Sequence, residues 1–88
     1  MVPFVASAYS GKGWPDTHVT AHGMDCWVEW KDVGKKGKDY ALQLHRCRQI
    51  RKAGGCAFIT DWPEAAVKAI QLWVSDGVLP PIELRRPK

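Results

Sequence analysis

Apolar and polar residues alternate along two short stretches, residues 16–21 and 25–31, in the pattern of half-buried β-strands. The tight connection His22-Gly23-Met24 lies between them, so we expect a β-hairpin over about residues 16–31. The segment Cys56-Ala57-Phe58-Ile59-Thr60 is a continuous apolar run of the length expected for a buried strand. These patterns predict a small mixed sheet.

Two longer segments carry helix signals on either side of residues 56–60. Asp39 can cap a helix over about residues 40–53, and Gly54-Gly55 can end it because glycine readily adopts positive φ. A second helix is expected over about residues 62–75, since a proline and an early acid stand in its first turn. The helices and the sheet together predict an α/β fold class.

The second predicted helix has signals at both ends, a capping residue at Asp61 and a stop at Gly77. After it, residues 78–88 contain two adjacent prolines and several basic residues. We expect this segment to be an extended, exposed basic tail. Residues 34–38, Gly-Lys-Lys-Gly-Lys, have no periodicity and are expected to form a basic loop.

Length and charge narrow the class of protein. The 88 residues are expected to form a single small domain, residues 1–88, with its core at about 11–77. The net charge is +4 and the pI about 9.2, which suits a polyanionic partner. Three cysteines without paired spacing argue against a disulfide framework and fit a reducing cytosol. No stretch approaches the roughly 18 apolar residues of a membrane span, so we expect a cytoplasmic protein that does not enter a membrane.

Four polar residues are notable for their order and spacing: Asp16, Glu29, Lys31 and Gln43. Two carboxylates can hold a hard divalent cation through oxygen, and such a cation can activate a water and stabilise charge on a phosphate. Glu29 and Lys31 share one face of a strand because they are two residues apart. Gln43 falls within the apolar arc of the first predicted helix, where its amide needs hydrogen-bond partners. Side chains from three elements can therefore converge on one point.

The register of the predicted hairpin decides which of these residues meet. A turn centred on Gly23-Met24 puts Asp16 opposite Lys31 and His18 opposite Glu29. His18 is then a candidate for supporting Glu29 without itself binding the metal. Each feature also has a plainer explanation, because Glu-x-Lys pairs often face solvent and an aspartate after proline often belongs to a turn.

In this order, the residues resemble the PD-(D/E)XK nuclease superfamily and, more closely, its VRR-NUC family, which includes small stand-alone phage and bacterial proteins. The resemblance covers about residues 11–69. It is carried by Gly13-Trp14-Pro15-Asp16, Glu29-Trp30-Lys31, Gln43, Gly54-Gly55-Cys56-Ala57-Phe58-Ile59 and Trp62-Pro63-Glu64-Ala65-Ala66.

The resemblance implies a compact PD-(D/E)XK-like core and an Mg²⁺- or Mn²⁺-dependent DNA endonuclease that hydrolyses phosphodiester bonds. Asp16 and Glu29 would ligate the metal, with the Trp30 carbonyl as a further ligand. Lys31 would orient the nucleophilic water or stabilise the transition state, and Gln43 would support the site. Small relatives of this kind are associated with homodimers that act on branched DNA, particularly four-way (Holliday) junctions, in a bacterium or a phage-infected host. The five tryptophans of this chain also suggest apolar surface buried against a second copy.

Basic residues near this set can hold a phosphate backbone, which gives affinity and salt dependence rather than sequence recognition. The candidates are Lys35, Lys36 and Lys38 in the basic loop and Arg46, Arg48, Arg51 and Lys52 on the first predicted helix.

Alternatives stay open. Many members of the family carry another acid upstream of the glycine-proline-aspartate element, and residues 1–12 contain none. That departure favours a non-catalytic DNA- or partner-binding module on the same fold, and a toxin-like or regulatory protein is a further alternative. His18, His22 and Cys26 form a competing candidate metal site, for zinc, although no fourth ligand is evident.

Overall fold

The computed structural model describes residues 4–8, 15–32 and 37–87, with the backbone alone for residues 4–8. Its elements are β1 (Phe4–Ala8), β2 (Thr17–Ala21), β3 (Met24–Trp30), α1 (Tyr40–Lys52), β4 (Cys56–Thr60), α2 (Pro63–Asp76) and β5 (Glu83–Leu84). The strands form one mixed sheet in the order β1-β2-β3-β4-β5. The β1–β2 and β2–β3 pairs are antiparallel, and the β3–β4 and β4–β5 pairs are parallel. The predicted α/β fold class is therefore confirmed.

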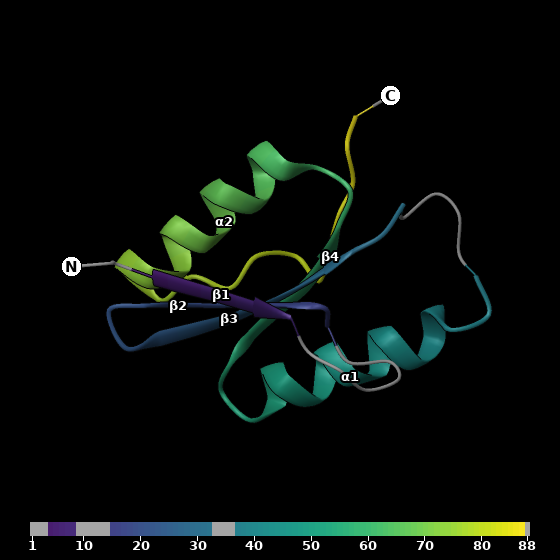
Figure 1. Ribbon diagram of the computed structural model, residues 1–88, viewed down its shortest axis with the longest axis horizontal. Helices are drawn as coiled ribbons and strands as arrows, with labels where there is room; N and C mark the ends of the chain where they lie inside the picture. The colour runs from purple at the N-terminus through teal and green to yellow at the C-terminus, as the bar shows by residue number, and fades with distance from the viewer. Residues whose placement is uncertain (1–3, 9–14, 33–36, 88) are drawn as a thin grey trace.

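The two helices lie on opposite sides of the sheet, α2 on one face and α1 on the other (Figure 1). Each helix lies within a crossover between parallel strands, because such strands cannot be joined by a tight turn. Strand β4 is consequently covered on both faces, and all five of its residues are buried. Double coverage explains why residues 56–60 are continuously apolar, and the predicted strand has the predicted bounds.

Alternate residues of the central strands belong to two separate hydrophobic clusters, one on each face of the sheet. The cluster under α2 contains Cys26, Val28, Cys56, Phe58, Ala66, Ala69 and Trp73. The cluster under α1 contains Tyr40, Cys47, Ala57 and Ile59, with Trp27, Leu44, Ile50 and Ile82 packed against it. Because side chains alternate between the faces of a strand, odd-numbered residues of β3 and β4 face α1 and even-numbered ones face α2. Glu29 therefore belongs to the α1 face.

The β2–β3 hairpin has a different register from the predicted one. His22 and Gly23 both have positive φ, 50° and 77°, so they form the two-residue turn in place of Gly23-Met24. Ala21 consequently pairs with Met24 and Thr17 with Val28. The predicted pairings of His18 with Glu29 and of Asp16 with Lys31 are wrong. The true register differs by two residues, so each side chain keeps its predicted face.

Both predicted helices form close to their predicted bounds. Asp39 occupies the position before α1, but its side chain makes no capping hydrogen bond. Helix α2 is preceded by Trp62 in an extended conformation, so the prediction of Asp61 as its cap is wrong. Gly54 and Gly77 follow the two helices with φ of 95° and 68°, the positive values expected of glycine after a helix. Within the described part of the chain, neither helix has the length and apolar character needed to cross a bilayer.

The C-terminal segment is the largest departure from the predicted fold. Pro80 is buried, Ile82 packs into the cluster under α1, and the carbonyl of Ile82 accepts a 2.8 Å hydrogen bond from the backbone N–H of Ile59. Residues 83–84 then form β5 on the open edge of β4. The prediction of an extended, exposed tail is therefore wrong for residues 80 and 82–84, because β4 offers backbone groups that need partners, whereas residues 78, 79, 81 and 85–87 are exposed as predicted.

Candidate functional site

Glu29 lies at the centre of the candidate site, on the α1 face of β3. Its side chain is only 6% exposed, although it is a carboxylate on a strand with neighbours on both sides. Helix α1 supplies one polar contact, a 3.5 Å hydrogen bond from Nε2 of Gln43 to Oε2 of Glu29. Acidic side chains are seldom buried without compensating partners, so this position requires an explanation.

Asp16 lies beside Glu29. The ladder pairs Thr17 with Val28, and one step further along the same register Asp16 lies opposite Glu29. Pro15, which precedes it, is fully buried and fixes the start of β2, whereas Asp16 itself is exposed. The site therefore has one buried and one solvent-facing carboxylate on adjacent strands.

The environment of Glu29 makes its ionised form unfavourable. Burial raises the pKa of the Glu29 carboxyl, and the negative charge of Asp16 raises it further, to about 7. The Lys31 ammonium and a hydrogen bond from the Asp16 backbone act in the opposite direction on this pKa but do not cancel the rise. Near neutral pH the positive charge around Glu29 and Asp16 therefore compensates only part of the cost of ionising Glu29.

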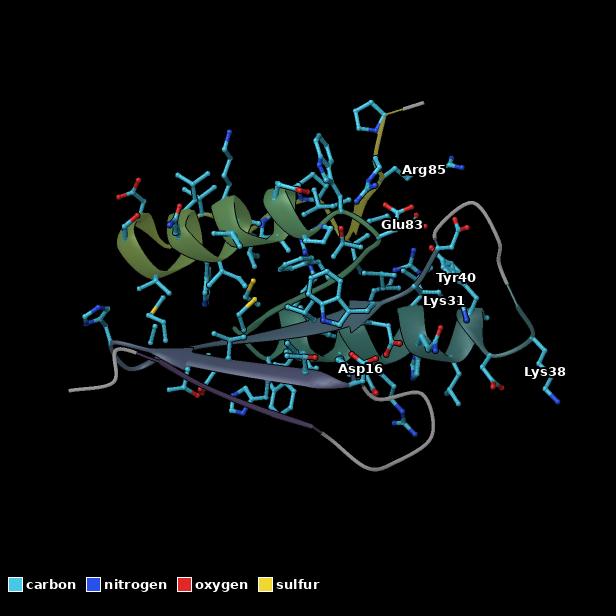
Figure 2. The ribbon with its side chains drawn as sticks, turned by 45° about the horizontal axis from the view of Figure 1, so that its top comes forward. Asp16, Lys31, Lys38, Tyr40, Glu83 and Arg85 are labelled. Atoms are coloured by element: carbon cyan, nitrogen blue, oxygen red, sulfur yellow. The ribbon has the colours of Figure 1, made fainter. Side chains whose placement is uncertain are left out.

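Lys31 contributes the positive charge that is present. Its backbone N–H donates a 3.0 Å hydrogen bond to the carbonyl of Thr60, which extends the β3–β4 ladder beyond the last assigned residue of β3. Its ammonium lies over Gly37, where a β-carbon would be 3.7 Å from Nζ. Figure 2 shows Asp16 and Lys31 at the same end of the sheet, alongside α1. The predicted Glu-x-Lys pair thus lies at one end of the sheet with Asp16.

Gln43 projects from the buried side of α1. It is spaced three residues from Tyr40 and four from Cys47, both of which are buried, so the three share one face of the helix. Its Oε1 is buried and has no hydrogen-bond partner among the described residues. An unpartnered buried acceptor next to the Glu29 carboxylate is suited to a cation or to the water that a cation carries.

These groups fit a hard divalent cation. Carboxylate, amide and backbone oxygens are the ligands such ions prefer, and Mg²⁺ usually keeps several waters when only one or two carboxylates bind it. Among the described residues no cluster of three or more His, Cys, Asp or Glu side chains is found, so the acidic set is limited to Asp16 and Glu29. The Trp30 carbonyl, between Glu29 and Lys31 in the chain, stays a predicted ligand.

His18 does not have the role expected of it. It pairs with Trp27 and stacks on the Trp27 indole, with ring centroids 3.9 Å apart and an angle of 9° between the planes. Its Nε2 lies 3.0 Å from Oδ1 of Asp25, which also accepts a 2.8 Å hydrogen bond from Thr20. The structure thus ties His18 to Asp25 and not to Glu29, because the turn residues set a different register.

The competing zinc site is not formed. His22 lies exposed in the hairpin turn, and Cys26 is buried under α2. His18 belongs to the other face of the sheet, where it stacks on Trp27. The three side chains therefore cannot share one ion.

The predicted DNA contacts fall on different surfaces. Lys38 is exposed and directly follows Gly37, the residue over which the Lys31 ammonium lies. At 100° per residue, Arg46 and Arg48 lie about 160° apart around α1. Arg46 is on the flank of Gln43 and is partly buried, whereas Arg48 is exposed on the other flank. Gly13, Trp14, Lys35 and Lys36 lie outside the described residues.

Two further predicted contacts, Arg51 and Lys52, are at the end of α1. Arg51 donates a 3.1 Å hydrogen bond to the carbonyl of Ala57, so it serves the contact between α1 and β4, while Lys52 is exposed.

Sequence reasoning missed the polar cluster of His18, Thr20 and Asp25. Alternation places Asp25, Trp27 and Glu29 on one face of β3, but His18 and Thr20 join Asp25 only through the observed hairpin register, which the sequence did not indicate. The cluster lies on the α1 face of the sheet, and Trp27 stands between Asp25 and Glu29 along β3.

Protein-family models, curated proteins and solved structures were compared with the chain, and none of them matches it.

Proposed function

We propose that this protein is a metal-dependent DNA endonuclease of the PD-(D/E)XK type, similar to the VRR-NUC family, that hydrolyses phosphodiester bonds. The observation that carries the proposal is the buried Glu29 carboxylate with Asp16, Lys31 and Gln43 around it. An antiparallel hairpin, a helical crossover and a parallel strand support these residues, an arrangement that resembles the core of that superfamily.

Asp16 and Glu29 would hold Mg²⁺ or Mn²⁺, with the Gln43 amide oxygen or the Trp30 carbonyl as further ligands. When bound, the cation supplies Lewis-acid stabilisation of phosphate charge and a more acidic water. Lys31 adds a positive charge and three N–H donors, which orient a water or a phosphate oxygen next to the acids. Gln43 holds the Glu29 carboxylate by its Nε2–H donor.

The proposed substrate is DNA, with branched DNA such as a four-way junction preferred. Two cations support a phosphate-binding path beside the site: Lys38, which is exposed and follows Gly37 in the chain, and Arg46, on the Gln43 flank of α1. Such contacts give affinity that falls steeply with salt. The preference for branched substrates rests on the resemblance alone.

We further propose that the protein acts as a homodimer. Large apolar side chains that remain exposed support it, among them Trp30 at 41%, Leu72 at 49% and Leu79 at 41%. Sedimentation equilibrium measures the mass directly, and a monomer at micromolar concentration would refute this part of the proposal.

The test is cleavage of a labelled four-way junction beside linear duplex and single-stranded DNA, in Mg²⁺, Mn²⁺ or EDTA. The expected result is metal-dependent cutting that is fastest on the junction and is lost in Glu29→Ala. Cutting that persists in EDTA, or in Glu29→Ala, would refute the assignment of the site.

A second candidate function is a DNA-binding module without catalysis. The observation in its favour is that the described residues offer two carboxylates and no third acidic ligand. Tight junction binding with no cutting in either metal would support this alternative over the nuclease.

A further inference from the structure

Two buried thiols form a close pair outside the candidate site. Cys26 of β3 and Cys56 of β4 are register partners in the parallel ladder, and both belong to the cluster under α2. Both are free cysteines, at 1% and 0% exposure, with their Sγ atoms 3.1 Å apart. Neighbouring strands lie about 4.8 Å apart, within the Cα separations that disulfides span. The sulfurs need to approach by only about 1 Å to reach bonding distance.

The pair is chemically asymmetric. Cys26 donates the hydrogen bond and Cys56 accepts it. That hydrogen bond lowers the pKa of Cys56, burial opposes the effect, and Arg51 lowers this pKa as well. The same hydrogen bond, together with burial, raises the pKa of Cys26. Cys56 is thus the thiol that ionises more readily, and the thiolate is the nucleophile in oxidation.

A cavity brings small molecules close to the pair. It has a volume of about 660 Å³ and lies between β2 and α2. One of its lining residues, Val19, is the register partner of Cys26. Ile70 and Val74 line the cavity and also pack against the cluster that contains both thiols. A molecule the size of hydrogen peroxide therefore has a route that ends one side-chain layer from Cys26, whose Sγ is 3.1 Å from the Sγ of Cys56.

We propose that Cys26 and Cys56 form a peroxide-sensitive dithiol that closes to an intramolecular disulfide. The Cys56 sulfur attacks one peroxide oxygen, the O–O bond breaks, and a sulfenic acid and one water result. The Cys26 sulfur then attacks the Cys56 sulfur, gives up its proton and expels the hydroxyl group as a second water. Two thiols are oxidised by two electrons and one peroxide is reduced to two waters. Cys47, in the cluster under α1, takes no part.

The experiment exposes the folded protein to hydrogen peroxide, quenches the peroxide, unfolds the protein and counts thiols with a maleimide. The three thiols of the chain should fall to one, reversibly on addition of dithiothreitol. A non-reducing peptide map should show Cys26 joined to Cys56 within one chain. Cys47→Ser is the matched control, because it keeps the pair and its count should fall from two to zero. Cys56→Ser should keep both remaining thiols.

Three results would overturn the proposal. One is a full count of three thiols at a peroxide dose that oxidises the urea-unfolded chain. The second is a cross-link that contains Cys47 or joins two chains. The third is accumulation of sulfinic acid at Cys56 without a cross-link. The peptide map of the wild-type protein decides among these outcomes even if Cys56→Ser fails to fold.

Discussion

Glu29 has a buried carboxylate whose charge is poorly compensated by the described residues around it. Burial and the charge of Asp16 raise its pKa to about 7, and Lys31 reverses only part of that rise. A carboxyl group in such surroundings binds either a proton or a cation near neutral pH. Gln43 adds an unpartnered buried oxygen next to it. Buried acids with strongly shifted pKa values are typical of functional sites, where their cost to folding is retained.

The raised pKa predicts how stability depends on pH in the absence of metal. Glu29 holds its proton in the folded state up to about pH 7 but loses it near pH 4.5 when unfolded. The folded state therefore binds more protons between these values, and the stability that Glu29 contributes falls as pH rises from about 4.5 to 7. We expect Glu29→Gln to be more stable than wild type at pH 8, by on the order of 3 kcal/mol, with little difference at pH 4.

Urea unfolding of both proteins at several pH values, with EDTA present, measures this difference. Comparison with the variant removes the contribution of every other titrating group. An unchanged difference between pH 4 and pH 8 would mean that Glu29 ionises normally.

The edge of β4 shows how one element holds the C-terminal segment. The Thr60 side chain is fully buried and its hydroxyl makes two hydrogen bonds. It donates to the carbonyl of Leu84 at 2.9 Å and accepts from the backbone N–H of Trp62 at 2.9 Å. Asp61 adds a 2.9 Å hydrogen bond from the backbone N–H of Arg86. One hydroxyl group thus links β4, the start of α2 and β5.

Thr60→Val should be destabilising although it preserves shape. The substitution leaves the partly buried Trp62 N–H and Leu84 carbonyl without their partner, which costs up to about 1–3 kcal/mol for each group left unsatisfied. Thr60→Ser is the matched control, because it keeps the hydroxyl. Chemical unfolding of the three proteins, with hydrogen exchange at Trp62, tests the prediction. Equal stability of the valine variant and wild type would show that these hydrogen bonds add nothing.

Local signals were sufficient for α1, β4 and α2, whose bounds follow from periodicity, proline and glycine. They failed where the structure depends on distant contacts. Strand β5 has two residues and forms only because β4 has an open edge, which no local pattern reveals. The hairpin register failed because His22 adopts positive φ, which the sequence does not signal for histidine.

The residues of the candidate site show the same difference between local signals and distant contacts. Glu29 and Lys31 could be predicted from their spacing of two, and Gln43 from its place on the apolar arc of the helix. The error in His18 is a consequence of the hairpin register alone. The stacking of His18 on Trp27 depends on that register too, so it could not be foreseen.

The two functions that we propose lie on opposite faces of one small sheet. The α1 face carries the acids, Lys31 and Gln43, while the α2 face carries the thiol pair and the apolar cavity. The site therefore depends on α1 remaining docked, and α1 is held by Tyr40, Cys47 and the C-terminal Ile82. Cation binding should accordingly report on the folding of the whole chain.

Mn²⁺ should raise the thermal midpoint of the wild-type protein. A ligand that binds only the folded state adds about 2.7 kcal/mol at 100 times its dissociation constant, which corresponds to several degrees in so small a domain. Asp16→Asn and Glu29→Gln should each lose most of this increase. Asp76→Asn, an exposed acid at the end of α2, should retain it. Equal shifts in all four proteins would indicate non-specific binding.

The most direct measurement is the single-turnover rate of junction cleavage in Mn²⁺ for wild type, Lys31→Met and Lys38→Met. Methionine keeps the length of the lysine stem and removes its charge. We expect Lys31→Met to lose on the order of 100-fold or more in rate, since a positioned charge at the reacting phosphate acts mainly on the transition state. Lys38→Met should change the salt dependence of binding and leave the rate at saturation close to that of wild type. Cleavage by Lys31→Met at the wild-type rate would contradict the assignment of this site.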